Sequence, residues 1–357
     1  MKTSLPIAIC YLPGREQTYS RNRVMVAALR SVGFEVYDCS CRQRNIFRYV
    51  FAFFKFFRWQ HKCQIVLVGF LGQFLIPFVR LFTKKKILFD VFVSVYQTMA
   101  VDRASFSPNG WLAKLAKFID RLSCQLADHV LCDTNQNVDY FIREYRIDRT
   151  KFSRLFVGSD DKIFYPRKEI AVEPRLVHFH GEFQPLHGVE YIIQAAALLP
   201  EVQFQLIGQG KMWKRCFQMA QELSLQNIRF IPAVPYKKLP EMMTRAMICL
   251  GIFGNSPKAR MVIPHKAFEA IALRKPLITA NTPAARELFT HKQDAFLCPS
   301  ADPQALAQAI RELMADKNLA AHLAHNGYQL FQEKCNPAAL GREIVQVIQR
   351  EPFNGRI

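Results

Sequence analysis

The alternation of short apolar runs with amphipathic segments constrains the fold of this chain most strongly. Runs such as IAICYL (7–12), QIVLVGF (64–70) and KILFDVFVS (86–94) are each followed by a segment with helical periodicity. Runs that are apolar along their whole length predict strands of a parallel sheet covered on both faces by helices. The pattern restarts after the polar stretch 165–176. The sequence therefore predicts an α/β fold of two Rossmann-like, doubly wound domains facing a cleft.

The 357 residues are enough for two domains of ordinary size. We predict an N-terminal domain over 1–168, a C-terminal domain over 169–340, and a last helix at 341–357 that packs back on the N-terminal domain. The first apolar run, Pro6–Tyr11, is too short for a signal peptide and predicts a buried strand. The uncharged stretch Cys63–Val79 approaches a membrane span in length, but its glycines and proline favour a strand, a turn and a helix.

Positive charge is concentrated in one part of the chain. The formal net charge is +19, and no acidic residue occurs between Asp38 and Asp90. The segment Arg42–Lys62 combines arginines and lysines with closely spaced aromatic residues, which favours an anionic membrane surface over a nucleic acid. We therefore predict a peripheral protein at the inner, cytoplasmic face of a membrane, with no nucleic-acid partner. A buried amphipathic helix with solvated cations is the alternative.

Glycines follow two apolar runs of the C-terminal half. GEFQPLHG (181–188) follows LVHFH, and Gly208 and Gly210 follow VQFQLI. A glycine at a strand end lets backbone N–H groups approach a phosphate, and a helix starting near Gly188 directs its positive end there. Turns that bind no ligand are the alternative. Trp213 stands where a dinucleotide fingerprint needs its third glycine.

Lys266 and Glu269 carry the sharpest chemical signal. They are three residues apart and share one face at the start of a predicted helix. A lysine in that turn opposes the helix dipole unless an anion binds there. A diphosphate would supply the anion, and the carboxylate could accept hydrogen bonds from ribose hydroxyls. The apolar neighbours Ile263 and Phe268 favour a cleft over a solvated surface pair.

Together these segments resemble glycosyltransferase family 4 and its GT-B relatives, the glycosyl transferases group 1. The resemblance covers Val177 to Leu313 and rests on GEFQPLHG, LIGQG, IPHKAFEAIALRKPLITANTPAARELF and LCPSADPQALAQAI. It implies that Lys266 binds phosphate oxygens, that Glu269 holds the donor ribose, and that the base packs near Val234. The donor-binding residues predicted in this way are Gly181, Glu182, Phe183, His187, Gly188, Gly208, Gly210, Val234, Pro235, Lys258, Arg260, Pro264, Lys266, Glu269, Thr282 and Pro283.

Two departures from the family pattern concern the donor site. Met261 stands where the first glutamate of the E-x7-E motif belongs, and Glu182 and His187 replace the usual basic pair of the diphosphate loop. We infer that Lys258 and Arg260, together with Lys266, supply the missing positive charge.

The acceptor side is expected after the first and fourth strands of the N-terminal half. Gly14, Arg15, Tyr96 and Arg103 are predicted to bind the acceptor. Asp90 and Asp102 are the candidate catalytic residues there, beside Lys266 and Glu269 of the donor side. Asp90 would orient an acceptor hydroxyl or, alternatively, cap a neighbouring turn.

The resemblance implies transfer of a hexose from a nucleotide-diphosphate sugar, with retention of configuration, to a membrane-associated glycan or lipid-linked acceptor. The sequence has no D-x-D in a donor loop, and we expect neither a metal ion nor another cofactor. The alternatives are a nucleotide-sugar epimerase of the same fold and a catalytically inactive lipid-binding scaffold.

Overall fold

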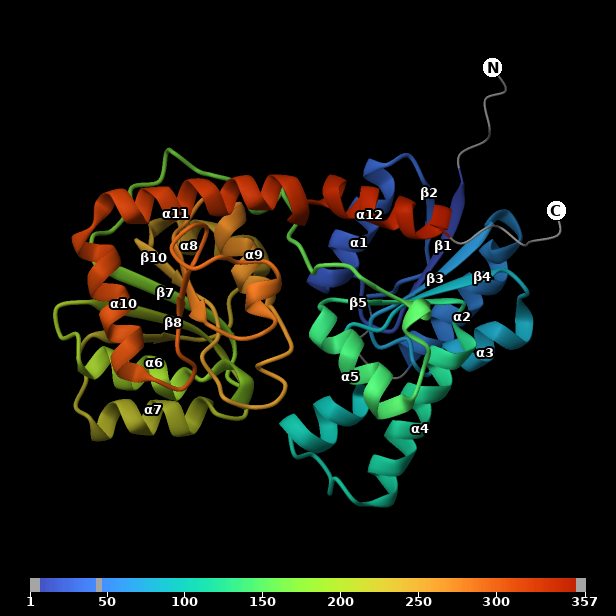
Figure 1. Cartoon of the computed structure of the whole chain (residues 1–357), viewed down its shortest axis with the longest axis horizontal. Helices are drawn as coiled ribbons and strands as arrows, with labels where there is room; N and C mark the ends of the chain where they lie inside the picture. Colours follow the sequence, from blue (N-terminus) through green and yellow to red (C-terminus); the bar gives the residue numbers. More distant parts are fainter. Residues whose placement is uncertain (1–6, 43–46, 351–357) are drawn as a thin grey trace. The chain divides into compact units, whose positions relative to one another are not determined.

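The computed structural model describes residues 7–42 and 47–350, and these form two compact units (Figure 1). One unit comprises Met1–Asp160 with Asn336–Ile357, and the other comprises Asp161–Cys335. The division falls between 160 and 161, whereas the sequence analysis placed it between 168 and 169. Residues 336–340, expected in the C-terminal domain, belong to the N-terminal unit because the last helix packs there. Pro6, residues 43–46 and the end of the predicted last helix at 351–357 lie outside the described residues.

The N-terminal unit is built on a parallel sheet in the order β2-β1-β3-β4-β5-β6. Its strands are β1 (Ala8–Pro13), β2 (Glu35–Asp38), β3 (Ile65–Gly69), β4 (Lys86–Asp90), β5 (His129–Cys132) and β6 (Phe152–Arg154). Its helices are α1 (Ser20–Ser31), α2 (Phe47–Trp59), α3 (Ile76–Phe82), α4 (Trp111–Leu126), α5 (Asn135–Tyr145) and α12 (Pro337–Arg350), with a π-helical segment η2 (Gln97–Asp102) after β4.

Helices cover both faces of this sheet (Figure 1). Side chains of α2, α3, α4 and α5 join one apolar core cluster with alternate residues of β1, β3, β4 and β5. On the other face α12 packs so closely on α1 that a Cβ on Gly341 would lie 2.4 Å from the Ala28 carbonyl oxygen. The stretch Cys63–Val79 contains β3 and the start of α3, as the sequence predicts. Within the described ranges, no helix has both the length and the apolarity needed to span a bilayer.

The C-terminal unit has its own parallel sheet in the order β12-β11-β10-β7-β8-β9. Its strands are β7 (Leu176–Glu182), β8 (Gln203–Gln209), β9 (Ile228–Ile231), β10 (Ile248–Leu250), β11 (Leu277–Ala280) and β12 (Phe296–Cys298). Its helices are α6 (Val189–Ala197), α7 (Trp213–Glu222), α8 (Leu239–Arg245), α9 (His265–Ala272), α10 (Pro303–Ala315) and α11 (Lys317–Leu330), with 3-10 turns η4 (Pro185–His187) and η5 (Tyr236–Lys238). The predicted pair of doubly wound parallel-sheet domains is confirmed.

Local signals explain where several of these helices begin. The side chains of Thr134, Asp302 and Asp316 accept hydrogen bonds from backbone N–H groups in the first turns of α5, α10 and α11. In the C-terminal unit α6, α7 and α10 bury their apolar faces against one side of the sheet. The polar side chains of β7 and β8 are thereby left to face α8 and α9 on the other side.

Candidate active site

The switch point of the C-terminal sheet lies between β7 and β10. These strands are neighbours in the sheet, while the chain itself continues from β7 to β8 on the other side. Ligands of doubly wound sheets bind outside the carboxyl ends of the strands at such a point. Gly181 and Glu182 end β7, and the segment 251–264 leads from β10 into α9. The predicted donor residues that follow β7 and β10 therefore lie together at the carboxyl end of the sheet.

All four predicted donor-site glycines have backbone conformations that favour glycine. The φ angles of Gly181, Gly188, Gly208 and Gly210 are 143°, 62°, 148° and 147°. A Cβ on Gly208 would lie 1.9 Å from the Gly181 carbonyl oxygen, and a Cβ on Gly210 would lie 2.7 Å from the Phe183 nitrogen. The loops after β7 and β8 therefore pack backbone against backbone.

Lys266 reaches from the first turn of α9 to the end of β7. It is only 4% exposed, and its Nζ lies 4.5 Å from the ring centroid of Phe179. A Cβ on Gly181 would lie 3.0 Å from this Nζ, so glycine leaves room for the ammonium group. The N-cap of the helix is Pro264, which carries no side-chain acceptor. The first turn of α9 thus combines a buried amine with the positive end of a helix dipole.

This environment is unfavourable for the charge of Lys266. Burial lowers its pKa to about 7, although the carboxylates of Glu269 and Glu182 act in the opposite direction. An anion bound beside Nζ would stabilise the charged form and raise the pKa again. The amine is therefore suited to take up a proton when a phosphate group binds.

Glu269 lies one turn further along α9 and is buried. Its two oxygens accept hydrogen bonds from different elements: His180 Nε2 on β7 donates to Oε2 at 2.8 Å, and Tyr236 Oη on η5 donates to Oε1 at 2.9 Å. Burial raises the pKa of Glu269, but the hydrogen bond from His180, with smaller effects of His265 and Tyr236, holds it below its usual value. The carboxylate is ionised, and each oxygen keeps a lone pair for a further donor.

A line of hydrogen bonds continues from Glu269 into the sheet. His180 Nδ1 and His178 Nε2 are 3.0 Å apart, and His178 Nδ1 lies 2.8 Å from Gln205 Nε2. The two histidines are two residues apart on β7, so they share one face, while Phe179 between them joins the apolar core on the other. The sequence analysis missed both histidines and Gln205, although the alternation HFH was the signal that could have revealed them.

His187 cannot supply the positive charge that the family places in the diphosphate loop. Its Nδ1 donates to the Glu182 carbonyl oxygen, and a Cβ on Gly181 would lie 3.3 Å from its Cε1. Burial and the nearby positive charges of Lys266 and Lys258 lower the pKa of His187 well below its usual value. His187 is therefore neutral.

Lys258 and Arg260 lie in the loop between β10 and α9. Lys258 is buried, and its charge acts on His187, whereas Arg260 is exposed. The Arg260 carbonyl oxygen accepts a hydrogen bond of 3.2 Å from the Ala284 nitrogen, which ties this loop to the segment after β11. Met261, at the position of the missing family glutamate, is half-buried and donates its N–H to the Lys258 carbonyl oxygen at 3.0 Å.

The structure corrects one donor assignment and refines others. The Phe183 side chain is fully buried in the apolar core, so only its backbone can face a ligand. Val234 is half-buried and Pro235 is exposed, and the next residue, Tyr236, is the one that contacts Glu269. Tyr236 was missed because nothing in its local sequence marks it. After β11, Pro283 is half-buried next to the buried Thr282, whose Oγ1 accepts from the Ala285 nitrogen at 3.0 Å.

In the N-terminal unit, Asp90 has a different place from the one predicted. It ends β4 with no exposed surface, and Arg21 on α1 donates to both of its oxygens at 2.9 and 3.0 Å. Arg21 also donates to the carbonyl oxygens of Phe156 and Val157 at 2.7 and 3.2 Å. The prediction that Asp90 orients an acceptor hydroxyl is therefore wrong in this structure, because both oxygens of its carboxylate accept hydrogen bonds from Arg21 inside the unit.

The loop after β4 is organised by a carboxylate that the sequence analysis did not single out. Asp120 of α4 is fully buried and accepts hydrogen bonds from Ser94 Oγ at 2.7 Å and from the backbone nitrogens of Val95 and Tyr96 at 3.0 Å. Tyr145 Oη donates to it at 3.0 Å. These bonds hold the chain where it enters η2.

The predicted acceptor residues of this loop lie at the two ends of η2. Tyr96 precedes it and is half-buried, with Lys117 Nζ 4.3 Å from its ring centroid. Asp102 ends η2 and is buried, and Arg103 follows it, half-buried. π-helical turns are frequent at functional sites.

Gly14 and Arg15, the other predicted acceptor residues, follow β1. A Cβ on Gly14 would lie 1.9 Å from the Leu71 carbonyl oxygen, so this turn also packs backbone against backbone. Arg15 is half-buried, donates to both carboxylate oxygens of Glu16 and lies over the ring of Tyr19. Its guanidinium is held in place from two sides.

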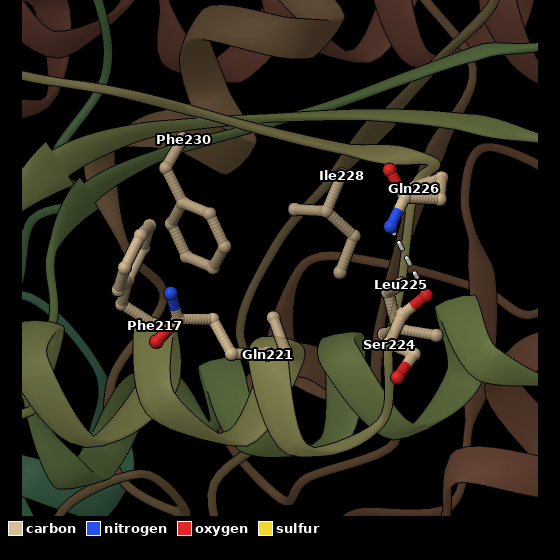
Figure 2. A pocket seen from close by; sticks show the side chains of 8 residues that line it. Phe217, Gln221, Ser224, Leu225, Gln226, Ile228 and Phe230 are labelled. Atoms are coloured by element: carbon tan, nitrogen blue, oxygen red, sulfur yellow. Dashed lines mark hydrogen bonds between the residues drawn. The ribbon is translucent and has the colours of Figure 1, made fainter.

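A separate hollow of about 360 Å³ lies beside the edge strand β9 (Figure 2). Its lining residues come from α7, from β9 and from the turn between them: Phe217, Ala220, Gln221, Ser224, Leu225, Gln226, Ile228 and Phe230. None of the predicted donor residues lines it. The hollow is therefore a surface feature distinct from the carboxyl ends of β7 and β10.

Comparison with known proteins relates part of the chain to one family of enzymes. Residues 161–330 match the model of the family described as glycosyl transferases group 1. An uncharacterized glycosyltransferase of Methanocaldococcus jannaschii is 26% identical over 161 residues, covering 44% of each chain. The chain spans about half the length of the curated relatives that it matches.

Solved structures show the same fold along almost the whole chain. The sucrose-phosphate synthase of Thermosynechococcus elongatus has a TM-score of 0.75 at 18% identity and covers 97% of this chain and 99% of its own. Anabaena HepE, solved in complex with UDP-glucose, has a TM-score of 0.72 at 14% identity, with coverage of 97% and 100%. The chain therefore has the GT-B fold of glycosyltransferases. Residues 161–330, which lie within the C-terminal unit, are similar to the glycosyl transferases group 1.

Proposed function

We propose that this protein is a glycosyltransferase that binds a nucleotide-diphosphate sugar at the carboxyl ends of β7 and β10. One observation carries the proposal: the buried Lys266 amine lies beside Gly181 at the start of α9, with the ionised Glu269 one turn further on. This arrangement offers a cation and backbone N–H groups to a diphosphate and a carboxylate to a ribose. The complex of HepE with UDP-glucose supports a uridine nucleotide as the first candidate donor.

In this proposal the remaining donor residues surround the nucleotide. Gly181, Glu182, Gly188 and the backbone of Phe183 border the diphosphate, and the base packs beside Val234 and Pro235. Thr282 and Pro283 border the sugar or the phosphate. Because Glu182 and His187 stand where the family has a basic pair, Lys258 and Arg260 supply the missing positive charge near the phosphates.

The chemistry follows from where negative charge develops. Breaking the bond between the sugar and the diphosphate leaves charge on the phosphate oxygens, and fixed cations there lower the barrier. We propose transfer of a hexose with retention of configuration, with the donor phosphate itself acting as base toward the acceptor, as in family 4. Lys266 and its neighbours would supply the positive charge that a metal ion supplies elsewhere, so the reaction needs no metal.

The acceptor side is proposed for the N-terminal unit, at Tyr96, Asp102 and Arg103 after β4 and at Gly14 and Arg15 after β1. Asp102 replaces Asp90 as the catalytic candidate, because Asp90 is engaged by Arg21. We propose a lipid-linked or membrane-associated acceptor, reached from the cytoplasmic face.

An aromatic face on the N-terminal unit supports the membrane part of the proposal. The helices α2, α3 and α4 bury their inner sides in one core and expose large apolar side chains on their outer sides. We define the aromatic face by its exposed residues, which are Phe47, Val50, Phe51, Phe54, Phe57, Phe74, Phe78, Leu81, Phe82, Val101, Trp111, Leu112, Leu115 and Phe118.

Contacts within the aromatic face join α2 to α3. The ring centroids of Phe57 and Phe82 are 4.9 Å apart, and the half-buried Phe53 beneath the face has its ring centroid 6.2 Å from that of Phe78. Exposed cations lie on the same helices and their ends, namely Arg58, Lys62, Lys84 and Lys114. Exposed aromatic rings with flanking cations favour the headgroup region of an anionic bilayer. The predicted docking segment Arg42–Lys62 is described at Arg42 and from 47 onward, and the face extends beyond it to α3 and α4.

A thermal-shift screen of nucleoside diphosphates tests the donor site. We expect one of UDP, GDP, ADP or TDP at a concentration 100-fold above its Kd to stabilise the wild type by about 2.7 kcal/mol. Glu269→Ala and Lys266→Ala should lose this stabilisation, and Lys258→Ala and Arg260→Ala should weaken it. Lys275→Met is the matched control, because it removes another buried lysine of the same unit, one bonded to the Thr244 carbonyl oxygen.

Two activity assays separate the alternative functions. Slow hydrolysis of a nucleotide sugar in the absence of acceptor distinguishes an active enzyme from a lipid-binding scaffold, and inversion of the sugar C2 centre would identify an epimerase. If no nucleotide stabilises the wild type, the donor site is inactive and the glycosyltransferase proposal is wrong.

Vesicle sedimentation tests the aromatic face. We expect the protein to sediment with vesicles containing anionic lipid, and to do so less at high salt because the cations are screened. Phe54→Glu and Phe78→Glu replace side chains that are 70% and 56% exposed, so the fold should be kept. Losing one inserted phenylalanine removes about 1.5–3 kcal/mol, which is a tenfold or larger loss of vesicle affinity.

Leu223→Glu is the control for this experiment, because it places the same charge on an exposed apolar residue of the C-terminal unit. Equal sedimentation of all three variants would contradict the membrane proposal. Sedimentation that does not depend on anionic lipid would contradict the part played by the cations.

A further inference from the structure

The hydrogen bonds behind Glu269 have one direction. Gln205 Nε2 carries only donors, so it donates to His178 Nδ1 at 2.8 Å. His178 then carries its proton on Nε2 and donates to His180 Nδ1 at 3.0 Å, which leaves His180 Nε2 to donate to Glu269 Oε2 at 2.8 Å. Gln205 Nε2 also lies 3.4 Å from the Met242 carbonyl oxygen, which fixes the amide orientation. The line begins at an amide and ends at a carboxylate.

These contacts fix the rotation of the Glu269 carboxylate. His180 holds Oε2 from β7, and Tyr236 holds Oε1 from η5 at 2.9 Å. Each oxygen keeps one lone pair, so the carboxylate can accept from two adjacent hydroxyls at once. A vicinal diol such as the 2′- and 3′-hydroxyls of a ribose has this arrangement.

Several titratable groups face this carboxylate and its partners. On β7 they are His178, His180 and Glu182; on α9 they are His265 and Lys266; on η5 it is Tyr236; and on β10 it is Cys249. Burial is the main effect that lowers the pKa of His178 well below its usual value, so His178 is neutral. A neutral His178 can both accept from Gln205 and donate to His180, as the line requires.

We propose that His180 is a positioning residue: supported by His178 and Gln205, it orients the Glu269 carboxylate for the 2′- and 3′-hydroxyls of the donor and makes the site selective for ribonucleotides over 2′-deoxyribonucleotides. The proposal rests on the proposed function, because it needs a nucleotide at Glu269. It adds residues of the sheet, behind Glu269, that would help the site to distinguish ribose from 2′-deoxyribose.

Calorimetric titration with UDP and 2′-deoxy-UDP tests the positioning role of His180. If the thermal-shift screen selects guanine, GDP and 2′-deoxy-GDP take their place. The wild type should bind the ribonucleotide about tenfold or more tightly than the deoxynucleotide, because one charge-assisted hydrogen bond is lost. In His180→Leu the affinity for UDP should fall about tenfold and that for 2′-deoxy-UDP much less, so that the ratio approaches one. His180→Gln should restore the ratio, since its Nε2 can donate to Glu269.

The pH profile of binding gives a second readout that a merely structural role would not move. Without the His180 donor, burial raises the pKa of Glu269, so UDP binding by His180→Leu should weaken as the pH falls toward 5, while wild-type binding changes less. His129→Leu is the control, because it removes a buried histidine from β5 of the N-terminal unit. It should leave the ratio and the profile unchanged.

The outcomes separate this inference from the function on which it rests. If no nucleotide binds the wild type, the proposed function is wrong and this inference with it. If UDP binds but His180→Leu keeps the wild-type ratio, or loses both nucleotides equally, the positioning role alone is overturned. Should His180→Leu fail to fold, Tyr236→Phe removes the other donor of Glu269, and an unchanged ratio in that variant would overturn the inference in the same way.

Discussion

Replacing Lys266 with methionine should abolish nucleotide binding and, at the same time, make the unliganded protein more stable. The amine lies beside Gly181 at the end of β7, and losing one such group at a developing phosphate charge costs about 3–4 kcal/mol, or at least a hundredfold in kcat/KM. The unliganded protein gains because the variant no longer buries an amine whose pKa is lowered to about 7. Transfer kinetics and urea unfolding measure the two effects.

The pH dependence of this gain has a definite sign. The native pKa is about 7, and the unfolded value of a lysine is about 10.4. Below pH 7 both states carry the charge, so the wild type pays the full burial penalty and Lys266→Met gains most. Between pH 7 and about 10.4 the unfolded chain binds more protons, so wild-type stability rises by up to about 1.4 kcal/mol per pH unit and the difference shrinks.

Nucleotide binding should then be accompanied by proton uptake at pH 8, because a diphosphate raises the pKa of Lys266. Titration calorimetry in two buffers of different ionisation enthalpy measures this uptake in the wild type. Lys275→Met is again the matched control, since its amine is buried in the same unit without facing the switch point. Wild-type binding by Lys266→Met would contradict the assignment of the diphosphate site.

Replacing Asp90 with alanine should destabilise the N-terminal unit by about 3–5 kcal/mol, because Arg21 would then be buried without its counter-charge. The Arg21 guanidinium joins α1 to β4 and to the chain after β6. Removing the Asp90 carboxylate would therefore leave a buried charge without its partner at the centre of the unit. Hydrogen exchange of the β4 amides, or the first transition in urea, measures the change.

The exposed pair Lys117–Glu144 gives the comparison for this experiment. Its side chains are 41% and 31% exposed, and Lys117→Met should cost less than about 1 kcal/mol. Full stability of Asp90→Ala together with lost transfer would return Asp90 to the acceptor side, as the sequence analysis had it. Loss of both stability and transfer supports the structural role.

Much of the donor site could be predicted because its signals are local. Lys266 and Glu269 are one helical turn apart, and Gly181, Gly208 and Gly210 lie at the carboxyl ends of strands, so periodicity and strand order were sufficient to bring them to one end of the sheet. The partners of these residues were not predictable in the same way. His180 and Tyr236 meet Glu269 from positions 89 and 33 residues away along the chain.

Asp90 illustrates why the acceptor side was harder. The local sequence around a carboxylate at the end of a central strand is the same whether that carboxylate faces a ligand or an internal arginine. The distinction depends on Arg21, 69 residues earlier, whose helix packs so that its guanidinium enters the unit. The allocation of residues 336–340 depended in the same way on where α12 packs.

The sequence by itself determined the two doubly wound domains, the strand-end glycines and the lysine–glutamate pair of α9, because each of these is encoded by spacing within a few residues. Only the tertiary structure decided which polar groups are enclosed together. The ionisation of Lys266, the donors of Glu269 and the engagement of Asp90 all depend on burial and on partners distant in the chain, since desolvation and hydrogen bonding act through space.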